Sequence, residues 1–76
     1  MHIKILGKGC KKCQLLEDNV KKAVESLGFD ATIEKVTDIN AIADHGILAT
    51  PGLIVDDEIK LVGRVASAKK LETLLQ

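Results

Sequence analysis

Two cysteines, Cys10 and Cys13, are the residues of this chain whose type and spacing could carry out chemistry. They are separated by Lys11 and Lys12, and the chain contains no other cysteine. Two thiols at this spacing on the first turn of a helix face the same side, so they can close a small disulfide ring or share one soft metal ion. The pair therefore predicts either thiol-disulfide exchange or metal binding.

The start of a helix would make the two thiols unequal. Cys10 is predicted to lie at the cap, where unpaired backbone N–H groups and the positive end of the helix dipole stabilise a thiolate, the reactive form of cysteine. Lys8, Lys11 and Lys12 bring further positive charge to the same end. Cys13 lies one turn inside the helix and is shielded. This arrangement suits an attacking and a resolving cysteine.

The cysteine pair is predicted to lie between a short strand and a long helix. Residues 2–6 mix apolar and polar side chains and end at Gly7, which indicates a strand closed by a flexible loop. Apolar residues then recur at intervals of three and four, which predicts a helix over 10–27 that Gly28 ends. The opposite face of this helix is charged, and Glu17 is expected there, paired with a lysine four residues later.

The rest of the chain completes an α/β pattern. Residues 30–36 are β-prone but half polar, which favours a strand at a sheet edge. A short helix over 39–45 follows. Residues 53–55 and 59–62 are predicted to form an antiparallel hairpin, and Ser67 is predicted to cap a last helix.

The predicted order is strand, helix, strand, helix, strand, strand, helix, in a single domain over residues 1–76. The first strand-helix-strand unit should be a parallel crossover, and the hairpin must then add to the other side of the first strand. We therefore expect a four-stranded mixed sheet with helices on both faces.

Three short motifs together resemble a known family. Gly9-Cys10-Lys11-Lys12-Cys13 follows the first strand, Thr50-Pro51-Gly52 precedes the hairpin, and Gly63 precedes the last helix. In this order the motifs resemble the thioredoxin fold in its smallest, glutaredoxin-sized form. The whole chain is similar to the small redox-active disulfide proteins of archaea and bacteria.

The resemblance implies an enzyme, a thiol-disulfide oxidoreductase without an organic cofactor. It implies that Cys10 is the nucleophile, that Cys13 is the resolving thiol, and that Pro51 is a cis proline beside the disulfide. Thr50 would hold a substrate chain by strand-like hydrogen bonds, and Gly63 would let a partner backbone approach closely. The implied partners are a disulfide-containing protein substrate and a separate reductase that restores the thiols.

A soft-metal-binding module or metallochaperone is the main alternative, because small heavy-metal-associated domains also carry two cysteines between a first strand and a first helix. Those domains end in a strand, whereas this chain is predicted to end in a helix. Zinc would need four ligands, and only His2 and His45 could join the cysteines. We expect His2 at the start of a strand in solvent, and His45 at a helix end, where a cationic ring would favour the dipole. A purely structural disulfide is a third alternative, although so small a loop constrains the unfolded chain little.

The composition excludes several classes of function. The chain has 76 residues, with eleven basic and eleven acidic residues, 46% apolar residues and a single aromatic residue. It therefore lacks the base-stacking side chains and the positive charge of nucleic-acid-binding proteins. No apolar run approaches the roughly 20 residues of a membrane span, and charges interrupt the first eight residues where a signal peptide would be apolar. We expect a cytoplasmic protein and a monomer, in a compartment where a cysteine pair is more often catalytic or metal-binding than structural.

The charges are unevenly distributed along the chain. Lys4, Lys8, Lys11 and Lys12 place four positive charges and no acid in the first twelve residues. The end that carries the cysteines is therefore predicted to be basic, and it could steer a reductase with an acidic surface.

Overall fold

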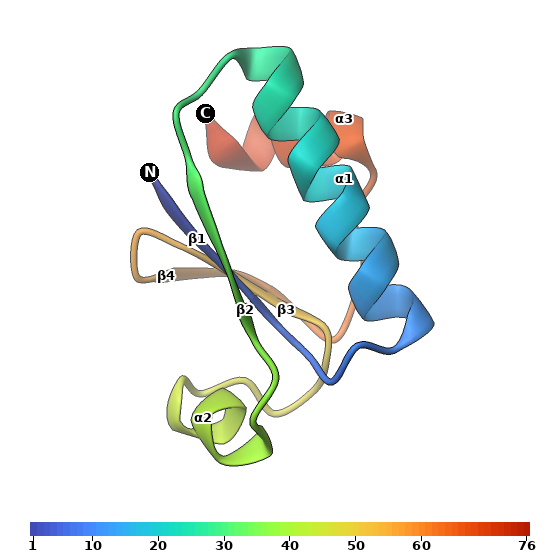
Figure 1. Ribbon diagram of the computed structural model, residues 1–76, viewed down its shortest axis with the longest axis vertical. Helices are drawn as coiled ribbons and strands as arrows, with labels where there is room; N and C mark the ends of the chain where they lie inside the picture. The colour runs from blue at the N-terminus through green and yellow to red at the C-terminus, as the bar shows by residue number, and fades with distance from the viewer.

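The computed structural model describes all residues from Met1 to Gln76, and it contains one sheet and three helices (Figure 1). The strands are β1 (His2–Leu6), β2 (Thr32–Val36), β3 (Gly52–Val55) and β4 (Glu58–Val62), and the helices are α1 (Lys11–Leu27), α2 (Ile39–Asp44) and α3 (Ala68–Leu75). The predicted order is confirmed, with boundaries that differ by one or two residues. None of the three helices has the length and apolar character required to cross a membrane.

The sheet is mixed, and its strands lie in the order β2-β1-β3-β4. β1 is parallel to β2 and antiparallel to β3, and β3 and β4 form an antiparallel hairpin. The predicted edge position of the half-polar strand β2 is confirmed. The hairpin turn is tighter than predicted, because Asp56 and Asp57 alone form it, with φ of 48° and 68°. Positive φ at both central residues is the requirement of a type I′ turn, which matches the twist of the paired strands.

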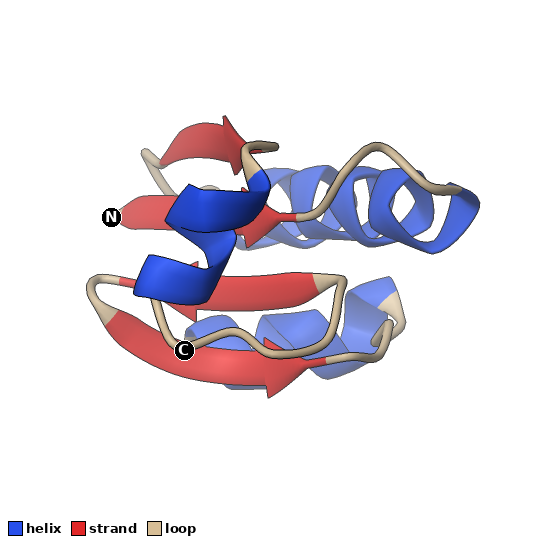
Figure 2. Ribbon diagram, turned by 90° about the horizontal axis from the view of Figure 1, so that it is seen from below, coloured by secondary structure: helices blue, strands red, loops and turns tan.

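Helices cover both faces of the sheet, as predicted. Figures 1 and 2 show α1 and α3 together on one face and the short helix α2 on the other. The larger core lies under α1 and α3 and includes the fully buried side chains of Ile3, Leu16, Leu53 and Leu71. A smaller core lies under α2 and consists of Leu6, Val36, Ile42, Ile47 and Ile54. β1 contributes to both cores because successive side chains of a strand point to opposite faces.

The ends of α1 and α3 are capped as the sequence predicts. Cys10 is the N-cap of α1, and Gly28 ends this helix in the left-handed conformation with φ 70°. Ser67 caps α3, where its hydroxyl accepts a hydrogen bond of 3.1 Å from the Lys70 N–H. These caps satisfy backbone groups that a helix end leaves unpaired, so they set where α1 begins and ends and where α3 begins.

Two adjacent leucines of α1 test the assignment of the core. Leu16 is fully buried, whereas Leu15 is 51% exposed. We expect Leu16→Ala to lower the free energy of unfolding by about 2–5 kcal/mol, because it leaves a cavity in the larger core. Leu15→Ala is the matched control and should cost less than about 1 kcal/mol. Urea denaturation of the two variants measures both values, and equal costs would contradict the burial of Leu16 and the packing of this helix.

Candidate active site

Three loops meet at one end of the sheet, next to the start of α1 (Figure 1). The strand register brings them together, because Leu6 pairs with Gly52 and Gly52 pairs with Val62. Three loops therefore join the sheet at neighbouring positions: the loop after β1, the loop before β3 and the loop after β4. The Gly63 N–H donates a hydrogen bond of 2.8 Å to the Pro51 carbonyl, which ties two of these loops together.

The two cysteines form a disulfide at this end, with their Cα atoms 5.0 Å apart. Cys10 lies at the N-cap, as predicted, and its Sγ accepts a hydrogen bond of 3.2 Å from the Cys13 N–H. Cys10 is exposed, whereas Cys13 is only 4% exposed. The sequence prediction that the second cysteine is shielded is therefore confirmed.

Gly7 packs directly against the inner cysteine. A Cβ atom at Gly7 would overlap Sγ of Cys13 and would lie 3.1 Å from its Cβ. The same position is 3.9 Å from Cα of Pro51. Pro51 is fully buried and lies beside the cysteine pair, and the Thr50–Pro51 peptide bond is cis, as the resemblance implied.

Thr50 and Gly63 differ in whether their backbone groups are already hydrogen-bonded within the protein. Thr50 is exposed, and its backbone N–H and C=O make no hydrogen bond within the protein. Gly63 already donates its N–H to Pro51, and a Cβ on this residue would lie 2.9 Å from Cβ of Ala49. Its positive φ of 72° also favours glycine. Gly63 therefore holds the Pro51 loop in place through its hydrogen bond, whereas the backbone groups of the exposed Thr50 have no partner.

The three lysines around the cysteines, Lys8, Lys11 and Lys12, are all exposed. None of them forms an ion pair. We call them the site lysines. Lys4 does not belong with them, because it is half-buried in the middle of β1 and its Nζ lies 3.2 Å from Nε2 of His45.

A groove of about 330 Å³ lies between α2 and the site loops. Lys8 and Thr50 line its end nearest the cysteine pair, and its remaining lining is apolar: Ile39, Ile42, Ala43, Ile47 and Leu48. Leu48 is 91% exposed and Ile39 is 58% exposed, so apolar surface is open to solvent beside the disulfide.

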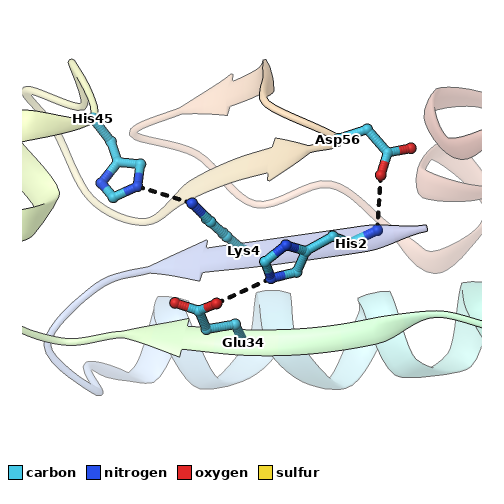
Figure 3. A network of polar contacts seen from close by, with 5 residues as sticks. All are labelled: His2, Lys4, Glu34, His45 and Asp56. Carbon is cyan, nitrogen blue, oxygen red and sulfur yellow. Dashed lines mark hydrogen bonds and ion pairs between the residues drawn. The ribbon is translucent and has the colours of Figure 1, made fainter.

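Both histidines make contacts of their own away from the cysteines (Figure 3). His2 is exposed at the start of β1, as expected, and its Nε2 lies 3.0 Å from Glu34 Oε1. His45 Nδ1 lies 2.7 Å from the Ala41 carbonyl, and its Nε2 faces the Lys4 ammonium. An ammonium can only donate a hydrogen bond, so Lys4 Nζ is the donor in the contact with Nε2. His45 lies at the end of α2, as expected, and Lys4 of the neighbouring strand β1 lies next to its ring.

The sequence prediction placed Glu17 wrongly. The predicted charged face of α1 put it in solvent, but it is only 6% exposed and is the one buried charged residue. Its Oε2 lies 3.1 Å from Lys21 Nζ and its Oε1 lies 3.2 Å from Lys35 Nζ on β2. The spacing held the signal, because Glu17 follows Cys13 by four residues and precedes Val20 by three, and both of these lie on the buried stripe.

The two lysines keep this buried carboxyl ionised. Burial alone would raise the pKa of Glu17, but the hydrogen bonds and positive charges of Lys21 and Lys35 outweigh it and hold the pKa below its ordinary value. At neutral pH Glu17 is therefore a carboxylate enclosed beside Cys13.

Comparison with known proteins points to one family. A model of the thioredoxin domain matches residues 1–76. A thioredoxin of Methanothermobacter thermautotrophicus is 47% identical over 75 residues, which is 99% of this chain and 97% of that protein. A thioredoxin of Methanocaldococcus jannaschii is 47% identical over 74 residues, which is 97% of this chain and 85% of that protein.

The contact between Gly7 and Cys13 can be tested by a double-mutant cycle. Gly7→Ala should lower the free energy of unfolding of the oxidised protein by about 1–3 kcal/mol, because the new methyl group overpacks the site. In a Cys13→Ala background the overlapping sulfur is gone, so the same substitution should cost less. Denaturant unfolding of the four proteins gives the coupling energy. Equal costs in both backgrounds would show that Gly7 is not required by the packing of Cys13.

Proposed function

Since this chain belongs to the thioredoxin family and is a thiol-disulfide oxidoreductase, we propose that Cys10 is its attacking cysteine and Cys13 its resolving cysteine. The observation that carries the proposal is the difference in access. Cys10 is exposed at a helix cap, where N–H groups stabilise a thiolate, whereas Cys13 is 4% exposed. A substrate disulfide can therefore reach only the first sulfur.

The proposed cycle has two exchange steps. The Cys10 thiolate attacks one sulfur of the substrate disulfide, so that a mixed disulfide forms and the other substrate sulfur leaves as a thiolate. Cys13 then attacks the Cys10 sulfur, which closes the Cys10–Cys13 disulfide and releases the second substrate thiol. The substrate gains two electrons and the cysteine pair loses them. A separate reductase returns these electrons, which makes the protein an electron carrier.

We propose that Thr50 and Pro51 hold the substrate chain next to Cys10. The free N–H and C=O of Thr50 support this role, because an extended substrate segment could pair with them as a neighbouring strand does. The apolar groove beside Lys8 is suited to side chains that flank the substrate cysteine. Gly63 contributes by holding the Pro51 carbonyl, and its close contact with Ala49 explains why a side chain there would disturb the loop.

We also propose that residues 1–76 act as one monomeric domain in the cytoplasm. One sheet shared by both cores supports a single domain. Charged residues on both edge strands, Glu34 and Lys35 on β2 and Glu58 and Lys60 on β4, disfavour edge-to-edge pairing with a second copy. A reducing compartment suits a pair that must be re-reduced in every cycle.

The order of the two cysteines can be tested by trapping. With a peptide that contains one disulfide, Cys13→Ser should accumulate a mixed disulfide through Cys10, because the step that resolves it is removed. Cys10→Ser is the matched control and should accumulate none, because its remaining thiol is buried. Mass spectrometry under non-reducing conditions measures both adducts. Equal trapping by the two variants, or trapping by Cys10→Ser alone, would reverse or void the assignment.

The site lysines predict a salt-dependent encounter with an acidic reductase. Unpaired and exposed charges steer a partner of opposite charge, and salt screens this attraction over about 10 Å at 0.1 M. We expect the second-order rate constant of reduction to fall with rising ionic strength. Replacing all three site lysines with Gln should lower this rate constant at low salt and flatten its salt dependence.

A matched control replaces three exposed lysines outside the site, Lys22, Lys69 and Lys70, with Gln. This control has the same net charge as the site variant, so it should retain most of the salt dependence. Stopped-flow mixing with the purified reductase measures the rates. An identical salt dependence of the wild type and the site variant would contradict steering by these lysines.

A further inference from the structure

A second groove lies between the edge strand β4 and helix α3, and we call it the β4–α3 groove. Its volume is about 350 Å³, and neither cysteine and none of the site lysines lines it. Three of its seven lining residues are cations and none is an acid. In a chain with eleven basic and eleven acidic residues, this local excess of positive charge favours an anionic ligand.

The three cations come from three different segments. Lys60 lies on β4, Arg64 lies in the loop after it, and Lys70 lies on α3. Arg64 and Lys70 are exposed and form no ion pair. Lys60 is 25% exposed, and its Nζ lies 3.2 Å from Oε1 of Glu58, whose side chain is 72% exposed. The groove therefore keeps two cations without a partner, and one of them is a guanidinium, which binds a carboxylate through two parallel hydrogen bonds.

The floor of the groove is apolar and recessed. Leu61 and Ala66 are buried, and Val65 and Leu74 are half-buried. The large apolar side chains that the protein exposes, such as Leu48, all lie elsewhere. A surface that inserts into a membrane needs protruding apolar side chains, whereas this floor is shaped to receive one. The lining therefore suits a ligand that combines negative charge with an apolar side chain.

A β-bulge in β4 brings charge and apolar surface to the same side. The register shifts between Leu53 and Ile54, which leaves Lys60 without a partner on β3. Successive side chains of a regular strand point to opposite faces, but Lys60 and Leu61 line the same groove. Bulges commonly re-aim a side chain in this way, and they also interrupt the regular edge that an added strand needs. A ligand therefore contacts this groove through its side chains and not by strand addition.

We propose that the β4–α3 groove binds a short acidic segment of a partner protein. Carboxylates of the segment contact Arg64 and Lys70, and one apolar side chain enters between Val65 and Leu74. The volume lies near the lower end of the range for ligand pockets, about 300–1,000 Å³, so the groove accepts one or two side chains. Because it shares no residue with the cysteine pair, the segment can stay bound while Cys10 exchanges disulfides. The proposal does not depend on the order of the two cysteines.

A peptide titration followed by NMR tests the proposal. The probe is the blocked peptide Asp-Glu-Leu-Glu-Asp, which has no cysteine, and the protein is oxidised and labelled with nitrogen-15. We expect saturable shifts of backbone amide signals at residues 60–66 and 70–74 and none at Cys10 or Cys13. A peptide with Ser in place of Leu should bind more weakly, because the floor stays empty. A peptide with Asn and Gln in place of its acids should not bind measurably.

Paired double variants test the two cations without a partner. Replacing Arg64 and Lys70 with Gln should raise the dissociation constant of the acidic peptide about tenfold, since an exposed ion pair contributes about twofold to fivefold in affinity. Replacing Lys22 and Lys69 with Gln is the matched control, because it removes the same charge from exposed positions outside the groove. The control should change the constant by less than about twofold, because these charges are remote and screened. All four side chains are exposed, so both variants should fold, and their amide spectra verify this.

Several results would overturn the proposal. They are no saturable shift, equal affinities of the two double variants, equal binding of the Leu and Ser peptides, or shifts centred on the site lysines. Binding of phosphatidylglycerol vesicles through Arg64 and Lys70, with no binding of the peptide, would assign the groove to a membrane surface instead. The proposed disulfide exchange is tested separately by trapping at Cys10, and the variant of Arg64 and Lys70 should trap as the wild type does in the Cys13→Ser background. A failure of one proposal therefore leaves the other standing.

Discussion

The close approach of the β1 backbone to the inner cysteine is the constraint on which the rest of the site depends. Gly7 lies where any side chain would collide with Cys13, so the first turn of α1 can sit directly against the end of β1. That contact places Cys10 at the exposed cap of the helix and buries Cys13 one turn inside. Cα of Pro51 lies close to the same point, 3.9 Å from where a Cβ of Gly7 would be. The chemical difference between the two sulfurs follows from this packing.

The sheet register brings the other parts of the site to the same place. β1 is central and contributes side chains to the cores on both faces, so its C-terminal end is held from both sides. β3 starts at Gly52, opposite the last residue of β1, and β4 ends opposite Gly52. The Pro51 loop and the Gly63 loop therefore have fixed positions beside the cysteine pair, although they are far from it in sequence. In this small protein, the hydrogen bonds of two strand pairs, β1 with β3 and β3 with β4, hold these loops in position.

Local patterns predicted the elements, but they could not predict how charges from different elements meet. The helix over 10–27 and the Ser67 cap follow from spacing and cap chemistry, and the cis bond before Pro51 was available only from the resemblance to a family. Glu17 was misplaced because its four-residue spacing from Lys21 suggests an exposed ion pair. Its carboxylate also pairs with Lys35 of β2, a contact between two elements that the spacing along one helix does not reveal. The contact of Lys4 with His45 likewise joins two elements, so no local pattern could predict it.

The position of the single buried charge is hard to explain by stability alone. Removing a carboxylate from water costs free energy, and the attraction within an ion pair often does no more than offset that cost. A protein with apolar side chains of similar volume at such positions is frequently as stable as one with the buried ion pair. The positions around Glu17 on α1, Leu16 and Val20, are apolar, so an apolar residue would continue the core there. The charge instead lines the same small hollow as Cys13. Its two lysines remain more than half exposed at 58% and 53%, so they neutralise it without burying further charge. A chain of 76 residues with a small core thus keeps one buried ion, paired with two lysines, next to its inner cysteine.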